Sequence, residues 1–572
     1  MENSKRQIWL NITMYALFIA LSIIYIWPFA HRGVIFGSGD LMFHVNRMEE
    51  LYQDIQHGVF IPRISAFSFN QVGSGINFFY PWLLLYPFVI LRLITNNPVS
   101  AFYIGIVLMN FLTLSVAYYS MLKFSFSRKR SFAFSIIYSF ANYRLYLVFN
   151  QNVLAEALAY TFMPLALLGF YEIFFHDNHK WPLLALGMTF LIYSHMLTTA
   201  LIALFLLGTL VIFWHFIDHK SQRFCSAIKA AFLALSLSAF YLLPFIEQTL
   251  SNNLVASWKG LEFVQTPSDT ILKSLNNSPY QYIGIVLIIT LFFGVLYWNK
   301  ASLADRYVYI AGTLLTVLTT TLIPWNKFIQ TPLSVIQFPY RLNGLATLLL
   351  SIYLSRIVQV WFSNSYSHYR IPTISLLALT LIPVGLVYSG EQQLITAREN
   401  IPYLSKRPTV RHYYPQQNGT SYNVTMSEWN NQLHYYAHNG SFDYFPKAVG
   451  DKVTQIALHK GIINGKAVPL GKQLTSSPNQ LRYYLSNIKA GEKVELPILY
   501  YQNDLVKVGN QEYRKPMVTN HSLIQITVPQ HNKYVTVKYK DSLVDIISVW
   551  ISVLTWLGII IYYLGYKIRS MQ

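Results

Sequence analysis

The stretch Gly37-Ser38-Gly39-Asp40-Leu41-Met42-Phe43-His44-Val45-Asn46-Arg47 is the part of the sequence around which the fold is organised. It directly follows the first long apolar run. Gly37 and Gly39 permit a tight chain reversal, because glycine tolerates positive φ angles. Ser38 or Asp40 can cap a helix that begins here. We therefore predict a turn that leaves a first membrane helix and enters a second, shorter helix.

Three polar side chains share one row of that predicted helix. Asp40, His44 and Arg47 fall at i, i+4 and i+7, which places them in line. Beside a bilayer, such a row can serve as base, relay and phosphate holder. The alternative is an interfacial helix whose charges are simply solvated. A neighbouring apolar row suits a membrane surface, and it consists of Leu41, Val45, Met48 and Ile55.

The composition indicates that most of the chain lies in lipid. Of 572 residues, 53% are hydrophobic and only 12% are charged, which is about half the charged fraction of a soluble protein. The formal charge of +19 comes from short Lys and Arg clusters between apolar runs. Because no continuous basic stripe is present, nucleic acid is not expected as a partner. Cys225 is the only cysteine, which excludes an intramolecular disulfide and a cysteine-based metal site.

Hydropathy predicts about twelve membrane spans with both termini in the cytoplasm. The run 8–30 is too long for a signal-peptide core and is expected to stay as a helix. The run 81–94 is shorter than the roughly 20 residues of a span, so we expect it to be re-entrant or interfacial. Basic clusters then fall inside, and Asp40 faces the outside. A break is expected at Ser194-His195-Met196. Further helices are predicted near 101–121, 131–149, 156–175, 181–198, 200–216, 228–247, 281–298, 307–324, 342–360, 371–389 and 544–566.

The composition between Ser389 and Asp541 is that of a soluble, mostly β domain. Residues 523–528 and 534–539 alternate with period two, and Pro529 to Asn532 would form the turn between them. Further strands are predicted around 494–496 and 506–508. The expected parts are a membrane catalytic domain at 1–389 with a first outer loop at 31–80, an extracytoplasmic β domain at 390–541, and a C-terminal helix and cytoplasmic tail at 542–572.

Ionisable residues from distant parts of the chain collect at the outer ends of the predicted helices. Such groups are costly at membrane depth and usually face a cavity or pathway. Each one alone could be an interfacial anchor, but no comparable set of carboxylates occurs at the inner ends. Two carboxylates leave a divalent metal possible and undecided. The set comprises Asp40, His44, Arg47, Arg144, Glu156, His195, Glu247 and Arg341.

Single members of this set have competing interpretations. Glu156 begins a helix, where a carboxylate can be purely structural. Arg341 follows aromatic residues at headgroup level and suits a phosphate through bidentate hydrogen bonds. His195 could relay a proton or be a satisfied buried histidine. No GxxxxGK[ST], HExxH or GxSxG motif occurs in its required context, so ATP hydrolysis, zinc proteolysis and serine hydrolysis lack support.

Several of these segments resemble a known group of membrane proteins. An acid just after the first membrane helix, an aromatic-proline segment before the next and a large C-terminal domain look like type C (GT-C) glycosyltransferases. More closely, the chain resembles bacterial YfhO-like proteins, related to a group labelled pyruvoyl-tetrahydropterin-synthase-related, a label that implies no pterin chemistry. The resemblance covers roughly the first 390 residues through Gly39-Asp40…His44…Arg47, Asn152 to Glu156, Tyr193-Ser194-His195, Leu243 to Glu247 and Gln337 to Arg341.

The resemblance implies a membrane glycosyltransferase. Its donor would be a sugar linked through phosphate to a polyprenol, undecaprenol in bacteria, and its acceptor an envelope glycopolymer such as teichoic acid or polysaccharide on the outer side. The chain lacks the WWDYG-like signature of oligosaccharyltransferases. In such enzymes the first-loop acid is a general base or a metal ligand, and this role falls on Asp40, with His44 and Glu156 beside it. The lipid phosphate and sugar would be held by Arg47, Arg144, His195, Glu247 and Arg341.

Two other functions remain open from the sequence. A transporter or flippase of a lipid-linked saccharide usually has charges near the midplane and internal repeats, and we find neither in the sequence. A non-catalytic envelope assembly protein would present its β domain to partners. It would tolerate the replacement of Asp40 and Arg341.

Overall fold

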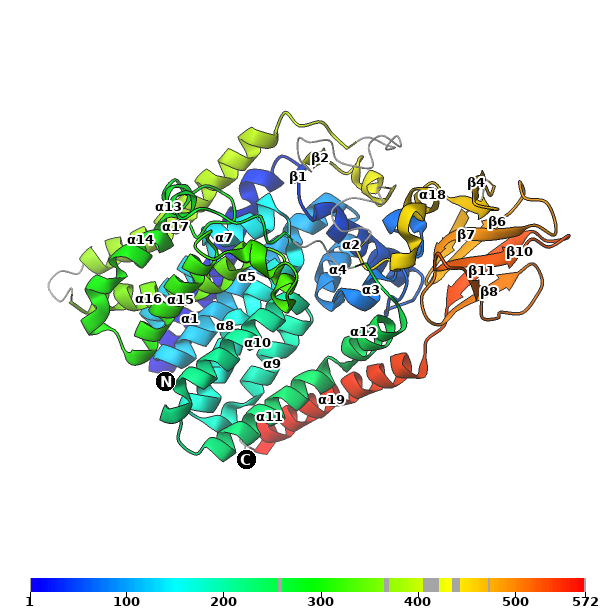
Figure 1. The fold of residues 1–572 in the computed structure, drawn as a ribbon. Coiled ribbons are helices and arrows are strands. Elements are labelled where there is room, and N and C mark those ends of the chain that lie inside the picture. Colours follow the sequence, from blue (N-terminus) through cyan, green and yellow to red (C-terminus); the bar gives the residue numbers. More distant parts are fainter. Residues whose placement is uncertain are drawn as a thin grey trace.

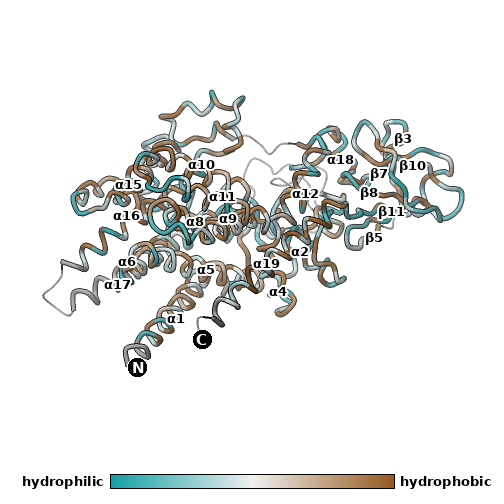
Figure 2. The backbone as a smooth tube through the Cα atoms, turned by 90° about the horizontal axis from the view of Figure 1, so that it is seen from below, coloured by the Kyte–Doolittle hydropathy of each residue, from teal (hydrophilic) through white to brown (hydrophobic). Residues whose placement is uncertain are grey.

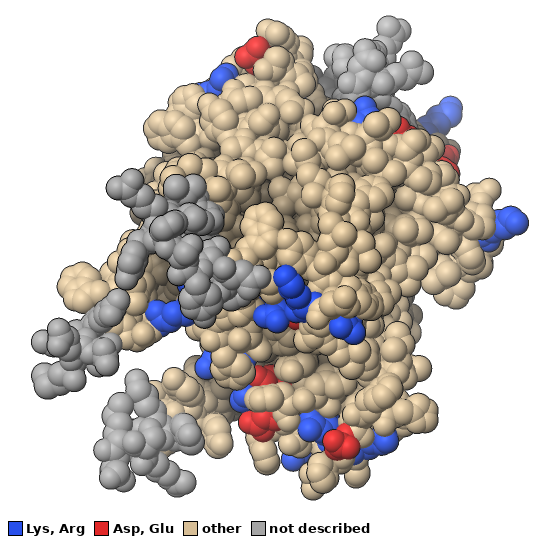
Figure 3. Space-filling view, turned by 90° about the vertical axis from the view of Figure 1, so that its left-hand side faces the viewer, with Lys and Arg blue, Asp and Glu red and all other residues tan. Residues whose placement is uncertain are grey.

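The computed structural model contains a helical bundle with a β-sheet region at one end and both chain termini at the other (Figure 1). The bundle is rich in hydrophobic residues, whereas hydrophilic and hydrophobic residues alternate in the sheets (Figure 2). The face of the bundle in Figure 3 is mostly uncharged, with Lys and Arg gathered in a few places. The structure describes residues 2–255, 260–364, 370–404, 421–434, 443–471 and 474–569, without the side chains of 2–6, 362–364, 370–376, 434 and 566–569.

Six helices in the described ranges are long and apolar enough to cross a membrane, and two bent pairs raise this number to eight. The single helices are α1 (Glu2–Ala30), α5 (Pro98–Ser125), α8 (Leu154–Phe175), α10 (Met196–Phe213), α16 (Leu342–Asn364) and α19 (Leu543–Arg569). The bent pairs are α6 (Arg128–Ser139) with α7 (Asn142–Leu145) and the π-helical turn Tyr146–Asn150, and α11 (Lys220–Leu237) with α12 (Ala239–Ser251).

The predicted number of twelve spans is therefore not confirmed. Several expected runs are shorter in the structure: α9 (Pro182–Ile192), α14 (Ile285–Phe293) and α15 (Leu303–Leu318) contain 11, 9 and 16 residues. At 1.5 Å per residue, such helices fall short of a core about 30 Å thick. The predicted helix 371–389 lies in α17 (Arg370–Arg398), whose first side chains are outside the described part.

Two finer expectations for the bundle agree with the structure. The segment after the first loop forms α4 (Tyr86–Thr95), whose 10 residues rise only about 15 Å and cannot cross a bilayer alone. The long apolar stretch after residue 181 breaks between the end of α9 at Ile192 and the start of α10 at Met196. A short helix α13 (Pro267–Leu275) precedes α14.

The C-terminal region contains two packed antiparallel sheets, as its alternating pattern predicts. One has the order β4-β3-β7-β10-β9 and the other β5-β6-β11-β8. Their inner faces share one apolar core, which includes Val494 and Ile524 from the first sheet and Leu481 and Val537 from the second. The strands are β3 (Lys460–Ile463), β4 (Lys466–Pro469), β5 (Leu474–Ser477), β6 (Gln480–Tyr484), β7 (Lys493–Leu499), β8 (Asp504–Val508), β9 (Met517–Val518), β10 (Leu523–Thr527) and β11 (Tyr534–Tyr539), with the short helix α18 (Val453–Ala457) before them.

The predicted hairpin between residues 523–528 and 534–539 is wrong. Both segments are strands, but β10 pairs with β7 and β9, whereas β11 pairs with β6 and β8. The connection between them crosses from one sheet to the other. This crossing lets the apolar faces of both strands enter the same core, which a two-stranded ribbon could not achieve.

The first loop joins the bundle to the sheets. Its strand β1 (Ile35–Gly37) pairs with β2 (Tyr422–Val424) from the C-terminal region. The Arg63 guanidinium lies 2.9 Å from the Asp541 carboxylate and 3.1 Å from that of Asp545, at the start of α19. These contacts hold the loop between the two halves of the molecule, together with the short helix α3 (Ile76–Phe79).

The helix after the first turn, α2 (Leu41–Gln56), is enclosed by protein rather than laid on a membrane surface. Most of its residues are buried, including His44 and Arg47 of the polar row and Leu41, Val45 and Met48 of the apolar row. Asp40 and Ile55 are half-buried. The indole of Trp429, in a turn at Trp429–His434, donates to Glu49 at 3.0 Å, and the Glu50 carboxylate accepts backbone N–H groups of the loop, among them that of Ala66 at 2.7 Å. The interfacial prediction is wrong, because the polar side chains of α2 hold the segments that cover it.

Candidate functional site

The turn before α2 is fastened to the start of α8. Gly39 has φ +49°, and a Cβ atom there would lie 2.2 Å from the Gln151 carbonyl oxygen. The Asp40 N–H donates to that carbonyl at 2.9 Å, and the Ser38 N–H donates to the Asn152 side chain at 3.0 Å. A glycine is required here, since both the left-handed backbone and the close approach exclude a side chain. The turn therefore brings Asp40 to the end of the bundle where Glu156 lies.

Asp40 occupies the N-cap position of α2 but makes no capping hydrogen bond, so the predicted cap is wrong. Within the described residues its carboxylate has no hydrogen-bond or ion-pair partner. Burial raises the pKa of Asp40 to about 7, and Asp443 and Glu156 push it in the same direction, whereas Arg341 opposes the shift. A carboxylate with a pKa near neutrality has the property that a general base needs.

Glu156 and Arg341 lie opposite each other beside Asp40. The Tyr143 hydroxyl donates to Glu156 at 2.7 Å, and the Arg341 Nε lies 3.7 Å from the other carboxylate oxygen. Arg341 also donates through Nη1 to the Gln337 side chain, and its guanidinium lies 5.3 Å from the Phe338 ring centroid. Within the described residues Nη2 of Arg341 has no partner. The guanidinium can therefore bind an anion without giving up these contacts.

His44 and Arg47 are fully buried one turn further along α2. Arg47 donates to the Pro81 and Tyr80 carbonyl oxygens and lies 4.6 Å from the Tyr80 ring centroid. Its Nη1 is 3.4 Å from Nδ1 of His44. Because a guanidinium only donates, Nδ1 accepts and the imidazole proton sits on Nε2. That nitrogen has no partner among the described residues. Burial, and then the charge of Arg47, lowers the pKa of His44, so the ring is a neutral donor.

Tyr80 connects this helix to His195. The His195 ring lies 5.9 Å from the Tyr80 ring, and its Nδ1 is 2.9 Å from the Thr198 hydroxyl. The structure thus brings six of the eight predicted residues into one region: Asp40, His44, Arg47, Glu156, His195 and Arg341. Tyr80 was missed as a site residue, although the aromatic-proline segment that contains it was noticed.

Two predicted site residues lie elsewhere. Arg144 donates to the Ala157 carbonyl at 3.3 Å and lies over the Tyr160 ring, inside the bundle. Glu247 accepts from the Ser542 hydroxyl at 2.8 Å, at the start of α19. Neither is among the charged neighbours of Asp40 or Glu156.

Asp443 is a second candidate residue that the sequence did not indicate. It lies in the C-terminal region and is close enough to influence the Asp40 carboxylate. Its neighbour Tyr444 stacks on Phe79 at 5.3 Å between ring centroids. The part of the chain that the structure describes contains no group of three or more His, Cys, Asp or Glu side chains arranged to hold a metal ion.

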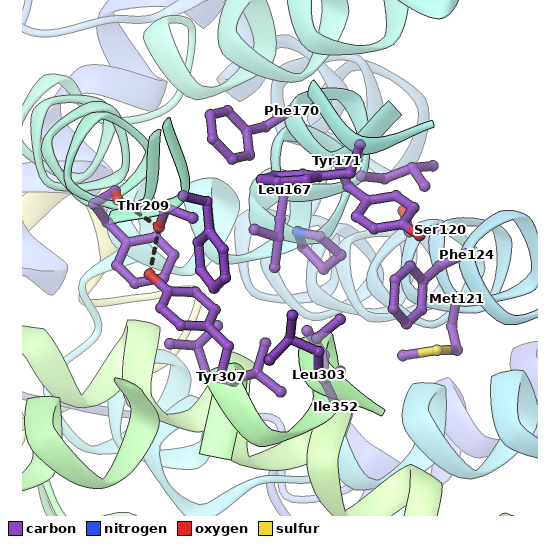
Figure 4. Close-up of a pocket in the computed structure, with 18 of the residues that line it drawn as sticks. Ser120, Met121, Phe124, Leu167, Phe170, Tyr171, Thr209, Leu303, Tyr307 and Ile352 are labelled. Carbon is purple, nitrogen blue, oxygen red and sulfur yellow. Dashed lines mark hydrogen bonds between the residues drawn. The ribbon is translucent and has the colours of Figure 1, made fainter. Parts of the chain in front are cut away.

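A large apolar cavity lies towards the opposite end of the bundle, with a volume of about 350 Å³. Figure 4 shows its aromatic and aliphatic lining, with a hydrogen bond of 2.6 Å between the hydroxyls of Thr209 and Tyr307. Along α8 its lining residues Leu167 to Phe175 are roughly 16–28 Å from Glu156. A smaller cavity touches both Glu156 and Arg341 and is also lined by Met163, Leu201 and Leu345.

Comparison with known proteins places the chain in a family. Residues 77–391, more than half of the chain, match the model of the 6-pyruvoyl-tetrahydropterin synthase related domain, described as a membrane protein. The chain therefore belongs to this family of membrane proteins, which confirms the resemblance seen in the sequence. Glu156, His195 and Arg341 lie inside the matched segment, whereas Asp40 precedes it. No curated protein matches the sequence.

Two solved structures are similar over much of the chain. The arabinofuranosyltransferase AftD from mycobacteria is 11% identical with a TM-score of 0.47, over 93% of this chain and 40% of AftD. The archaeal oligosaccharyltransferase AglB from Archaeoglobus fulgidus, solved with an inhibitory peptide and a dolichol-phosphate, is 12% identical with a TM-score of 0.36, over 68% of this chain and 56% of AglB. The chain thus spans about half the length of these proteins or less.

Proposed function

We propose that the protein is a GT-C-type glycosyltransferase of the cell membrane, which moves a sugar from a polyprenyl-phosphate carrier to an envelope glycopolymer on the outer side. The observation that supports this most is the half-buried Asp40 carboxylate, which has no partner among the described residues and lies beside Arg341. The proposed orientation puts both termini in the cytoplasm and residues 31–80 and 390–541 outside, because the basic clusters between the helices then lie inside.

In this reaction Asp40 takes the proton from an acceptor hydroxyl while that oxygen forms a bond to the anomeric carbon. The bond between that carbon and the phosphate oxygen breaks, and the carrier phosphate leaves with the electron pair. Base catalysis of this kind typically contributes about 10²–10⁴-fold. Nη2 of Arg341 and the Nε2–H of His44 have no partner among the described residues, and both are donors that can stabilise the charge on the leaving phosphate. Glu156 holds Arg341 in place.

The proposed path of the carrier chain follows two cavities in the bundle. The small cavity at Arg341 is lined by Met163, Leu201 and Leu345, and the large one by Leu167, Phe205 and Leu349 on the same three helices. On each helix, the residue that lines the large cavity comes four positions after the one that lines the small cavity. The large cavity therefore lies on the same faces of the three helices, one turn further along. A prenyl chain with its phosphate at Arg341 can follow this apolar seam.

The first experiment uses full-length protein in nanodiscs with undecaprenyl-phosphate carrying radiolabelled glucose, N-acetylglucosamine or galactose. Teichoic acid or an envelope polysaccharide is the acceptor. We expect transfer by the wild type and a loss of about 10²–10⁴-fold in Asp40→Asn, whereas Asp451→Asn, at an exposed carboxylate, keeps the full rate. Equal transfer by wild type and Asp40→Asn would contradict the proposal. Movement of the labelled lipid between leaflets without transfer would indicate a transporter instead.

A further inference from the structure

The outer face of the four-stranded sheet presents three cations at fixed spacing. Alternate residues of a strand point to opposite sides of the sheet. Because the side chain of Leu481 is buried in the core, that of Arg482 points outward. Arg482 and Lys507 lie on either side of Thr536 of the central strand β11, and Lys538 is two residues further along that strand. Strand geometry separates Arg482 from Lys507 by about 10 Å and places Lys538 about 7 Å along the face.

Tyrosine rings lie among these cations. The Arg482 guanidinium is 4.0 Å from the Tyr534 ring centroid, and the rings of Tyr534 and Tyr484 are 4.7 Å apart. The ammonium of Lys507 is 5.8 Å from the ring of Tyr513. The two tyrosine rings are tilted by 38° to each other. Aromatic rings present flat apolar surfaces to the C–H faces of a sugar or polyol, while the neighbouring cations remain available to anions.

No carboxylate of the described residues neutralises the positive charges on this face. The outward positions of β5, β6, β8 and β11 include no Asp or Glu, and in the described residues none of the three cations has a carboxylate within ion-pair distance. Elsewhere in the region cations do pair, as Lys452 does with Asp451 at 2.9 Å. A cluster of uncompensated cations repels itself and favours an anionic partner.

We propose that this face binds a polymer of sugar or polyol phosphates, with phosphates at Arg482, Lys507 and Lys538 and carbon faces on Tyr484 and Tyr534. The inference rests on the proposed function, because it makes this polymer the acceptor. The same sheet is tied to the loop that leads from Asp40: the Ser476 hydroxyl donates to the Ala66 carbonyl at 2.7 Å. A chain held on the sheet is thereby kept at a fixed position relative to the site.

The test measures binding of fluorescent, lipid-free poly(glycerol phosphate) to the full-length protein in zwitterionic nanodiscs. The variant Arg482→Gln/Lys507→Gln/Lys538→Gln, called the face variant, removes the three positive charges from this face. A matched control, Lys466→Gln/Lys489→Gln/Lys493→Gln, removes three exposed cations elsewhere in the β-sheet region. We expect the Kd to rise about tenfold in the first variant, with a weaker dependence on salt, and less than threefold in the control. Tyr534→Ala should weaken binding without changing the salt dependence.

Three results would overturn the inference. An equal loss in both triple variants would show that only net charge matters. Binding of uncharged dextran as tight as that of poly(glycerol phosphate) would exclude recognition of phosphate. Loss of binding to phosphatidylglycerol vesicles in the face variant, with polymer binding unchanged, would assign the face to the membrane.

A second measurement separates this inference from the proposed activity. Transfer to an acceptor of one repeat should be unchanged in the face variant, whereas the KM for the long polymer should rise. If no donor gives any transfer but the face variant still loses polymer binding, the glycosyltransferase fails and the binding face stands. If transfer occurs and the face variant changes neither the polymer Kd nor its KM, the face fails and the glycosyltransferase stands.

Discussion

Replacing Gly39 by alanine tests how the turn positions Asp40. The left-handed backbone at φ +49° costs an alanine about 1–2 kcal/mol. The new Cβ would also lie 2.2 Å from the Gln151 carbonyl oxygen, so the two segments must separate by about 1 Å to reach an ordinary contact distance. A displacement of about 1 Å at a catalytic group can cost about 10²-fold in rate, equivalent to about 2.7 kcal/mol of activation free energy.

Gly33→Ala is the matched control for this variant. Gly33 also has a positive φ, +63°, but a Cβ there meets no atom within 4 Å. An alanine at position 33 is therefore destabilised only by the left-handed backbone conformation. In nanodiscs, we expect both variants to lower the thermal midpoint, and only Gly39→Ala to lower the transfer rate by about 10²-fold. Equal transfer rates in the two variants would refute the argument that this close approach positions Asp40.

Two further predictions concern pH and stability. Because burial raises the pKa of Asp40 to about 7, the base is protonated and inactive below that pH; kcat/KM for transfer should fall about tenfold per pH unit below 7 and level off above 8, and a profile flat from pH 5 to 9 would contradict this role. Arg63→Ala leaves the fully buried Asp545 without its cation and should destabilise the fold by about 3–5 kcal/mol, measured as the thermal midpoint. Lys452→Ala, whose exposed pair is worth less than about 1 kcal/mol, is the control.

Much of the fold can be predicted from local sequence patterns. The predictions that were wrong share a common cause. The break before α10 and the strands β7, β8, β10 and β11 were predicted because hydropathy and alternation are properties of neighbouring residues. The number of spans was not, since composition does not reveal that α14 ends at Phe293 or that α11 and α12 bend by 77°. The pairing of β10 with β7 depends on packing across a shared core, which alternation alone does not specify.

In the candidate site, too, some residues can be predicted from the local sequence and others cannot. The glycines around Asp40 mark the turn, so its position was predictable from the sequence. Arg144 and Glu247 have the same signature of an ionisable residue near a helix end, yet their side chains meet Ala157 and Ser542 instead. Asp443 could not be found, because tertiary packing alone brings it to Asp40.

The contacts of the first loop determine the order in which the molecule can be completed. Arg63 is separated from its partner Asp541 by 478 positions in the chain, and the strand at Ile35–Gly37 must wait for residues 422–424. Contacts of such long sequence separation form late, because the intervening chain has to be made and placed first. The loop that holds Asp40 is synthesised near the start but can reach its final structure only after nearly the whole chain exists. A chain truncated before residue 422 therefore keeps the contact of Asp40 with Gln151 but lacks the C-terminal partners of the first loop.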